Sequence, residues 1–281
     1  MYKILEKKAL GPGMWYMRIQ APLVARRAMP GQFIMFRISE EGERVPLTIA
    51  DFDRQEGWVT IIFQEVGFST KQLGRLEQGD HILDFAGPLG QPSVLDGFKK
   101  VLCIGGGVGI APLYPQIKQL SQAGASVSVI IGARSKDYII LEEEIKGLSD
   151  SLYIATDDGS YGQKGFVTDI LKDLITKQAS KYDLVIAIGP LVMMKAVADF
   201  TRAFAIPTRV SLNPIMVDGT GMCGGCRVTV GGQTKYACVD GPEFDGHLVD
   251  FDEAMRRQGM YKQEERVDHF CRLTDQGGGS K

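Results

Sequence analysis

The sequence predicts a protein of three parts: an antiparallel β-barrel, a parallel-sheet α/β domain and a small module rich in cysteine. Residues 1–97 contain short strand-like runs separated by Gly and Pro turns, and residues 98–206 alternate apolar strands with helices. Residues 207–281 contain a loop with three of the five cysteines. We therefore expect domain boundaries near residues 97 and 206. A chain of 281 residues can hold several hydrophobic cores.

The first part is expected to form short antiparallel strands. The runs with β-type composition are Trp15–Ile19, Gln32–Ile38, Trp58–Phe63 and His81–Phe85. Gly11–Gly13 and Pro30–Gly31 lie between such runs, and these residues favour turns. Short strands separated by regular turns are typical of an antiparallel barrel.

The second part changes to a βαβ pattern at Lys99. The predicted strands are Val101–Ile104, Ser126–Gly132, Leu152–Thr156 and Leu184–Ile188, and the predicted helices lie near Phe166–Leu174 and from Leu191 to Phe204. The strands are mostly apolar, which is typical of a parallel sheet covered on both faces.

Glycine-rich and polar turns follow three of these strands. Gly105–Pro112 opens a helix with bare backbone amides, which is where a pyrophosphate binds. A glycine turn alone also occurs as a simple strand-to-helix connection. However, Thr156–Ser160 and Gly189–Pro190 follow two other strands, so the three turns would meet at the carboxyl edge of one sheet. Open α/β sheets bind their ligands at that edge.

The third part has the ligand spacing of an iron–sulfur protein. Asp218, Cys223, Cys226 and Cys238 are separated by four, two and eleven residues. A plant-type 2Fe–2S cluster uses a Cys-x4-Cys-x2-Cys run and one more distant Cys. Here a carboxylate occupies the first position. The glycines within the loop allow the chain to wrap closely around a cluster.

Two alternatives remain open for this loop. The thiols with a carboxylate or with His247 could hold a structural zinc ion, since zinc uses the same donors. Alternatively, Asp218 is a turn residue, and Cys271 supplies the fourth thiolate.

Composition excludes several classes of partner. A net charge of −2 and a pI near 6 leave no basic surface for nucleic acid. Apolar stretches end well short of the roughly 18 residues that a membrane-spanning helix needs. The amino terminus does not resemble a signal peptide, so we expect a cytoplasmic protein with reduced thiols.

Taken together, these motifs resemble the ferredoxin reductase-type flavoproteins over essentially the whole chain. Pro46–Thr48 is similar to their flavin-binding strand, Gly67–Thr70 to their second flavin turn, and Gly105–Pro112 to their nicotinamide turn. The order of the three parts resembles the small subunit of NADH-dependent reduced ferredoxin:NADP oxidoreductase, an electron-bifurcating enzyme. It also resembles the electron-transfer subunit of type B dihydroorotate dehydrogenase.

The resemblance implies three cofactors: FAD in the barrel, NAD(H) in the α/β domain and a 2Fe–2S cluster in the cysteine loop. Arg134 and Lys136 follow the second strand of the α/β domain, so NADP(H) also remains possible. The implied cofactor-binding residues are Pro46, Leu47, Thr48, Phe63, Gln64, Gly67, Ser69, Thr70, Gly105, Gly106, Gly107, Gly109, Pro112, Arg134, Asp157, Asp158, Gly159, Gly189 and Met193. The implied cluster ligands are Asp218, Cys223, Cys226 and Cys238.

The resemblance also implies a function. Hydride passes between the nicotinamide and FAD, and the cluster passes single electrons to or from a larger flavin and 4Fe–4S subunit, on which NADP(H) and ferredoxin react. The dihydroorotate-type subunit has Cys as first ligand, so Asp218 favours the bifurcating type.

The chain departs from the family pattern before the flavin strand. Family members often have an Arg three residues before the Ser or Thr of that strand, whereas here the position is Val45 and the basic residue is Arg44.

The alternatives are an electron-transfer subunit of a dihydroorotate dehydrogenase or sulfide dehydrogenase, and, in another class, a zinc-stabilised nucleotide-binding module that senses redox state. The zinc-stabilised module would be colourless.

Overall fold

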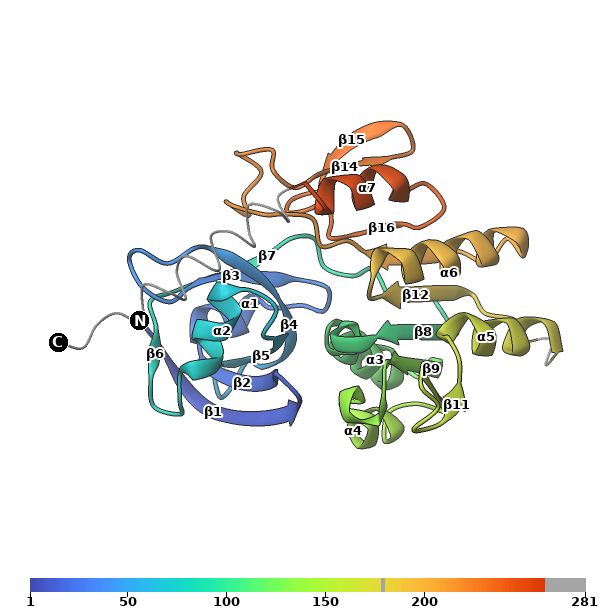
Figure 1. Ribbon diagram of the computed structural model, residues 1–281, viewed down its shortest axis with the longest axis horizontal. Coiled ribbons are helices and arrows are strands. Elements are labelled where there is room, and N and C mark those ends of the chain that lie inside the picture. The colour runs from blue at the N-terminus through green and yellow to red at the C-terminus, as the bar shows by residue number, and fades with distance from the viewer. Residues whose placement is uncertain (178–179, 261–281) are drawn as a thin grey trace.

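A computed structural model describes residues 1–177 and 180–260, and these form the three predicted parts. In Figure 1 the barrel lies on the left, the parallel-sheet domain on the right, and the cysteine module above the space between them. The fold class predicted from the sequence is confirmed.

The barrel is one antiparallel sheet of seven strands in the order β6-β1-β2-β5-β4-β3-β7. The strands are β1 (Tyr2–Gly11), β2 (Met14–Gln20), β3 (Phe33–Arg37), β4 (Val45–Asp53), β5 (Trp58–Gln64), β6 (His81–Ile82) and β7 (Asp84–Leu89). The run His81–Phe85, expected as one strand, is divided. Its first two residues pair with β1 and its last two pair with β3, so the run joins the two edges of the sheet and nearly closes the barrel.

Two helices, α1 (Pro22–Arg27) and α2 (Phe68–Arg75), lie against the barrel. Inward residues of the strands form a buried core with Val24 of α1 and Leu73 of α2. Burying a side chain of this size stabilises the fold by about 1.5–3 kcal/mol. The period-two alternation of these strands thus produces one filled interior.

The second sheet has the order β11-β10-β9-β8-β12-β13-β16, with all pairs parallel except the last. Its strands are β8 (Lys100–Gly106), β9 (Ser126–Ala133), β10 (Ser151–Thr156), β11 (Gln163–Lys164), β12 (Leu184–Ile188), β13 (Thr208–Ser211) and β16 (Glu243–Asp245). β13 and β16 follow residue 206, so the sheet continues into the segment assigned to the cysteine module. The boundary at residue 206 stays a prediction.

Helices cover both faces of this sheet (Figure 1). They are α3 (Ile110–Gln122), α4 (Glu142–Lys146), α5 (Val167–Lys172) and α6 (Leu191–Ala203), with 3-10 turns at Gly107–Gly109 and Lys136–Tyr138 and a π-helical turn at Asp173–Lys177.

Successive residues of the central strands enter different cores. Val101 and Cys103 of β8 pack with α3 and with barrel residues such as Ile62, whereas Leu102 and Ile104 pack with α5, α6 and the cysteine module. One face of the parallel sheet therefore packs with α3 and the barrel, and the other packs with the cysteine module and with two residues of the barrel strand β3.

The cysteine module contains a hairpin, β14 (Arg227–Val230) with β15 (Gln233–Tyr236), and the helix α7 (Phe251–Gln258). The side chains of Cys226 and Cys238 belong to the core shared with the parallel sheet. Among the helices of residues 1–177 and 180–260, none combines the length and the hydropathy that crossing a membrane would require.

Candidate functional site

The glycine turn, Gly105–Pro112, lies at the carboxyl end of the central strand β8. Gly107 has a φ of +56°, and beyond its chain neighbours and the adjacent helical backbone no atom of the described residues lies within 4 Å of where its Cβ would be. In the part of the chain that the structure describes, no side chain caps the N-terminus of α3, and its first turn has no acidic residue. This helix end therefore presents amides in the way that phosphate-binding sites do.

The turn after β12 packs directly against the glycine turn. β8 and β12 are adjacent, and the chain reaches β12 only after β10, so the direction of strand connection reverses between them. A Cβ on Gly106 would lie 2.5 Å from Met193 Sδ, and a Cβ on Gly189 would lie 3.1 Å from Gly106 Cα. Only glycines allow this backbone contact. Ligands of open α/β sheets bind at such a reversal point.

The turns after β9 and β10 lie at the same edge. The Arg134 guanidinium is 4.6 Å from the centre of the Tyr138 ring. The Asp157 amide donates to the last carbonyl of β9, and Asp158 Oδ1 accepts from the Ser160 hydroxyl and amide at 2.7 and 2.9 Å. The Ser160 hydroxyl lowers the pKa of Asp158, so the carboxylate form is favoured. The predicted residues Arg134, Asp157 and Asp158 are thus gathered in neighbouring turns.

The predicted flavin strand lies on β4, where Pro46, Leu47 and Thr48 pair with residues 33–35 of β3. All three residues are half-buried, as is Gln64 at the end of β5. Phe63 differs, because its side chain is 1% exposed and packs in the barrel core. The alternation of β5 directs Phe63 inward, so any contact with a cofactor would have to come from its backbone.

The second predicted flavin turn is held by its own hydroxyl groups. Thr70 Oγ1 accepts from the amides of Gly67 and Val66 at 3.0 and 3.1 Å, at the start of α2. Ser69 Oγ donates to Glu43 Oε2 at 2.8 Å. These contacts join the turn to the loop before β4 and position the start of the helix.

The cysteine loop brings two of its thiols together. Cys226 Sγ and Cys238 Sγ are 3.2 Å apart, and both residues are 2% exposed. Gly219 and Gly221 have φ values of +83° and +88°, which a residue with a side chain rarely adopts. The loop therefore folds back on itself between Asp218 and Cys226.

Backbone amides face Cys223. The amide of Gly225 is 3.4 Å from Cys223 Sγ, and this amide, with those of Asp218 and Val217, lowers the pKa of the thiol. Such amides favour the thiolate, which is the form that binds metals. By contrast, burial and the Cys226 thiol raise the pKa of Cys238, an effect that a bound cation would reverse.

Asp218 is engaged within its own loop. Its Oδ2 accepts from the amide of Thr220 at 2.9 Å and from the Thr220 hydroxyl, and these bonds hold the pKa of the carboxyl below its usual value. The alternative in which Asp218 is a turn residue therefore also has support. Cys271, the ligand in that alternative, lies outside the described residues.

Within residues 1–177 and 180–260, no three His, Cys, Asp or Glu side chains are grouped closely enough to hold a metal ion.

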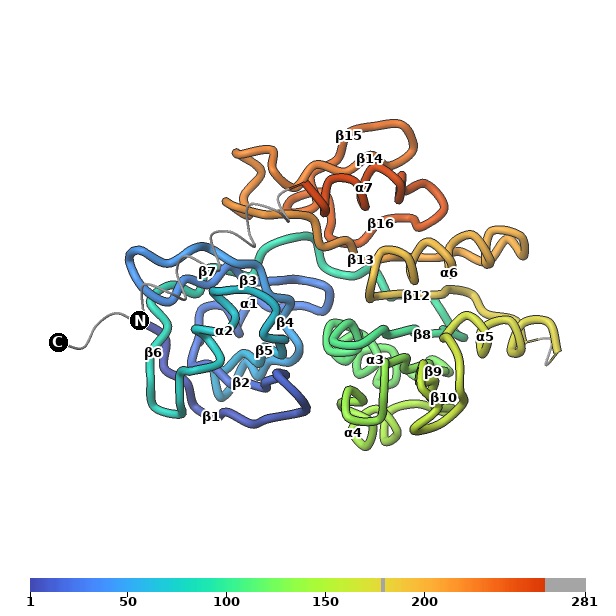
Figure 2. Tube along the Cα trace, in the orientation of Figure 1, coloured from blue at the N-terminus to red at the C-terminus, as the bar shows by residue number. Residues whose placement is uncertain are grey.

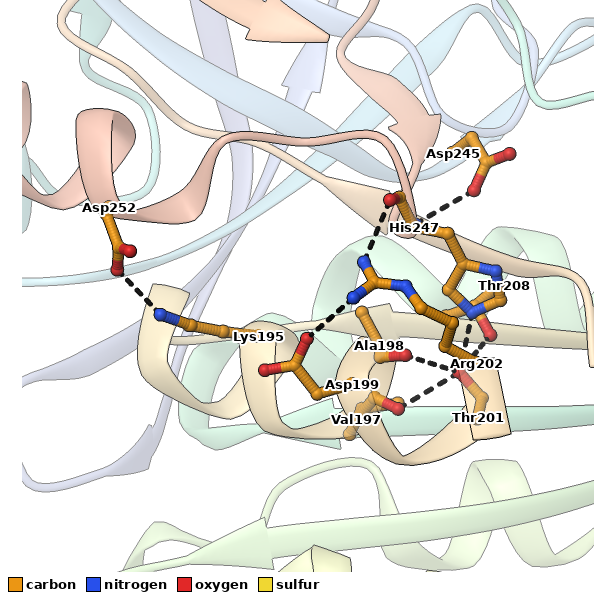
Figure 3. Close-up of polar contacts among 10 residues, drawn as sticks. All are labelled: Lys195, Val197, Ala198, Asp199, Thr201, Arg202, Thr208, Asp245, His247 and Asp252. Carbon is orange, nitrogen blue, oxygen red and sulfur yellow. Dashed lines mark hydrogen bonds and ion pairs between the residues drawn. The ribbon is translucent and has the colours of Figure 1, made fainter. Parts of the chain in front are cut away.

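His247, the other candidate zinc ligand, is bonded to α6 (Figure 3). Its Nε2 lies 3.0 Å from Thr201 Oγ1, which also receives a hydrogen bond from Thr208 Oγ1 at 2.6 Å. Arg202 donates to the His247 carbonyl at 2.8 Å. These contacts connect α6 to the segment after β16, and the structure does not bring His247 to the thiols.

The cysteine loop also contacts the barrel. A Cβ on Gly219 would lie 2.7 Å from Met35 Cγ, so the loop backbone rests on the Met35 side chain. Met35, on β3, pairs with Pro46 of the predicted flavin strand. Arg44 makes a smaller contribution to the low pKa of Asp218 and is therefore also near the loop. Met35 was not predicted as a site residue, since its sequence neighbourhood is that of an ordinary barrel strand.

Comparison with known proteins agrees with this arrangement. A family profile described as the iron–sulfur cluster binding domain of dihydroorotate dehydrogenase B matches residues 213–250. A second profile, described as an oxidoreductase NAD-binding domain, matches residues 103–199.

Three similar proteins cover almost the whole chain. An uncharacterized Clostridium beijerinckii protein encoded in the adh 3′ region is 56% identical, over 94% of this chain and 92% of the relative. A Thermotoga maritima homologue of the dihydroorotate dehydrogenase B (NAD(+)) electron transfer subunit is 48% identical, over 95% and 94%. The structure of NADH-dependent reduced ferredoxin–NADP oxidoreductase, described with flavin-based electron bifurcation, contains a chain with 46% identity and a TM-score of 0.92 over 98% of both chains. This chain therefore belongs to the family of dihydroorotate dehydrogenase B electron-transfer subunits, as an oxidoreductase subunit with an NAD-binding domain and an iron–sulfur cluster binding domain.

Proposed function

We propose that this chain passes electrons between NAD(H) and a larger flavin and iron–sulfur subunit, with FAD in the barrel and a 2Fe–2S cluster in the cysteine loop. One observation supports this most strongly: Gly219 of the cysteine loop packs on Met35, which pairs with Pro46 of the predicted flavin strand. The cluster loop and the flavin strand are thus one β-strand apart. When bound, the three cofactors supply hydride and single-electron chemistry.

The residues of the chain bind and orient these groups. The amides at the start of α3 would hold the pyrophosphate of NAD(H), and Met193 would lie beside the nicotinamide part of the crevice. Pro46, Leu47 and Thr48 would contact the flavin ring, and the turn Gly67–Thr70 would hold the FAD pyrophosphate. The four predicted ligands Asp218, Cys223, Cys226 and Cys238 would hold the cluster.

The chemistry of these donors fits the proposed groups. Thiolates wrap iron, and the amides that face Cys223 are of the kind that tune clusters through N–H to sulfur hydrogen bonds. The glycines at the turns of β8 and β12 leave the open backbone that a dinucleotide needs. Arg134 stays available for a 2′-hydroxyl or a 2′-phosphate, so NAD(H) is proposed with NADP(H) as the alternative.

The proposed partner is the larger subunit of a bifurcating NADH-dependent reduced ferredoxin:NADP oxidoreductase, on which NADP(H) and ferredoxin react in the cytoplasm. The similarity in sequence and structure to that enzyme supports it. A second candidate is the electron-transfer subunit of a dihydroorotate dehydrogenase, which the Thermotoga relative favours. Isolation of the native complex would distinguish them, because ferredoxin-dependent NADP+ reduction and dihydroorotate oxidation need different partner subunits.

Replacement of Asp218 tests the cluster ligands. In Asp218→Ala we expect iron loss, or a shifted visible and electron paramagnetic resonance spectrum, because an oxygen ligand is removed. In Asp218→Cys we expect retained iron and an altered spectrum, since a thiolate replaces a carboxylate. Iron, zinc and released flavin are measured on protein purified without oxygen.

Thr220→Val provides the matched control, because it removes the hydroxyl that bonds Asp218 but keeps the carboxylate. It should retain iron. Unchanged spectra in both Asp218 variants would assign Asp218 to the turn and move the fourth ligand elsewhere. A colourless protein that contains zinc would instead support the redox-sensing module.

A further inference from the structure

A carboxyl group lies where the three parts of the molecule meet. Glu243 Oε1 accepts hydrogen bonds from Ser93 Oγ at 2.6 Å and from Gln116 Nε2 at 2.7 Å. Glu243 begins β16, five residues after Cys238, while Gln116 is on α3 and Ser93 is in the linker between barrel and parallel sheet. One oxygen atom thus connects the cysteine module, the helix of the glycine turn and the linker.

The linker is joined to the cysteine module by further bonds. The backbone amide of Gln91 donates to the Gly241 carbonyl at 2.7 Å, and its side-chain Nε2 donates to the Val239 carbonyl at 2.8 Å. Figure 2 shows the trace from β7 passing beside β13 before it enters β8. The segment after Cys238 is therefore bonded to the linker. Within the described chain, this linker is the segment that joins the last strand of the barrel to the first strand of the parallel sheet.

Two buried oxygens of this junction have no hydrogen-bond partner among the described residues: Glu243 Oε2 and Gln116 Oε1. Gln116 is fully buried, and Glu243, although half-buried as a residue, has a buried carboxyl group. Both atoms are acceptors if the carboxyl is ionised, and leaving a buried polar atom without a partner costs about 1–3 kcal/mol. The two side chains are already joined by the hydrogen bond from Gln116 Nε2 to Glu243 Oε1. In a cyclic acid–amide pair, a second hydrogen bond runs from the acid O–H to the amide oxygen. A single proton on Oε2 would satisfy both atoms.

We propose that Glu243 retains a proton on Oε2 in the folded protein and that this O–H group donates a hydrogen bond to Gln116 Oε1. This neutral pair is then a positioning element that holds the cysteine module against the linker and α3. Its relevance to electron transfer rests on the proposed function, but the existence of the pair does not.

The surrounding groups act in opposite directions. Burial raises the pKa of Glu243, whereas the bonds from Ser93 and Gln116 and the charge of Arg209 lower it. Arg209 donates to the Val94 carbonyl and lies 5.5 Å from the centre of the Phe98 ring. Cys103 of β8 is also near, because Glu243 contributes to the raised pKa of that buried thiol. Burial is the largest of these effects on Glu243.

The raised pKa fixes the sign of the pH dependence. Between the ordinary carboxyl value of 4.5 and the higher value in the folded state, the folded protein binds more protons than the unfolded protein. The contribution of the protonated Glu243 to the free energy of unfolding is therefore complete below pH 4.5. It is lost as the pH rises through the pKa that Glu243 has in the folded protein.

Glu243→Gln tests the pair, because a carboxamide keeps both accepted bonds and donates permanently to Gln116 Oε1. We expect this variant to melt within about 2 °C of wild type at pH 5.5 and to lose less stability than wild type toward pH 9. Glu243→Ala should melt about 3–10 °C lower throughout, since Ser93 and Gln116 lose their acceptor. The exposed Glu56→Gln serves as control and should keep the wild-type pH profile.

Infrared spectroscopy reports the proton directly. The carbonyl band of a protonated carboxylic acid, sensitive to D2O, should be present in wild type and Glu56→Gln at neutral pH and missing in Glu243→Gln. If the band is unchanged in Glu243→Gln, or if that variant melts as low as Glu243→Ala at pH 5.5, Glu243 is ionised and the proposal is wrong. Both measurements are independent of NADH oxidation, so a failure of the proposed function would not change them.

Discussion

Cys226→Ser should leave the protein without its iron and without the visible absorbance of an iron–sulfur cluster. Cys226 is buried, its Sγ is 3.2 Å from that of Cys238, and serine is a much weaker ligand for iron than a thiolate. Removal of a residue that only hydrogen-bonds to a metal ligand reduces metal affinity by about 10–100-fold. Removal of a ligand itself should reduce the affinity further. Iron and acid-labile sulfide per chain are the measured quantities.

The same variant should retain the rest of the molecule. NADH binding and flavin content should stay near wild type, because the glycine turn and β4 do not contact Cys226 through any bond that the structure describes. Cys103→Ala is the matched control, since Cys103 is a buried thiol on β8 outside the loop. A Cys226→Ser protein with full iron would contradict the assigned ligands, as would loss of iron from Cys103→Ala.

Gly107→Ala should weaken NADH binding by about 10–100-fold, equivalent to about 1.4–2.8 kcal/mol. The added methyl group would occupy the space at the start of α3 that we assign to the pyrophosphate. Since no described atom outside the adjacent backbone lies within 4 Å of that position, the methyl group would not clash with other parts of the protein. Titration of NADH followed by flavin fluorescence, or by calorimetry, measures the effect.

Gly124→Ala separates ligand contact from backbone strain. Gly124 lies just past the opposite end of α3, with a φ of +78°. Like Gly107, it has no described atom beyond the adjacent backbone within 4 Å of its Cβ position. Both substitutions should cost about 1–2 kcal/mol of stability, because a residue with a side chain disfavours positive φ. Only Gly107→Ala should lose affinity for NADH. Equal affinities in the two variants would place the dinucleotide elsewhere.

Much of the fold could be predicted because its signals are local. The apolar strands of the parallel sheet and the alternating strands of the barrel follow from hydrophobic periodicity over a few residues. The division of His81–Phe85 into two strands could not be predicted. Its five residues have the same β-type composition throughout, yet its two ends pair with opposite edges of the sheet. Which edge each half joins depends on closure of the whole barrel.

The candidate site was predictable where its chemistry follows from spacing. Asp218, Cys223 and Cys226 lie close in sequence, so their common loop was evident. The glycines of Gly105–Pro112 indicated a phosphate site, and this site stays a prediction. Phe63 illustrates the limit of this approach. A motif similarity placed it in the cofactor-binding set, whereas the register of β5 directs its side chain into the barrel core.

By itself, the sequence determined the order of the three parts, the apolar strand cores, the glycine turn and the cysteine spacing, because each depends on residues that are near one another in the chain. Only the tertiary structure decided which distant segments meet: the cysteine loop on Met35, His247 on α6, and Glu243 with Ser93 and Gln116. The physical reason is that such contacts form when whole elements pack, and no periodicity or spacing in one sequence encodes which residue of a distant element becomes the partner. Gln116 and Glu243, for example, are 127 positions apart.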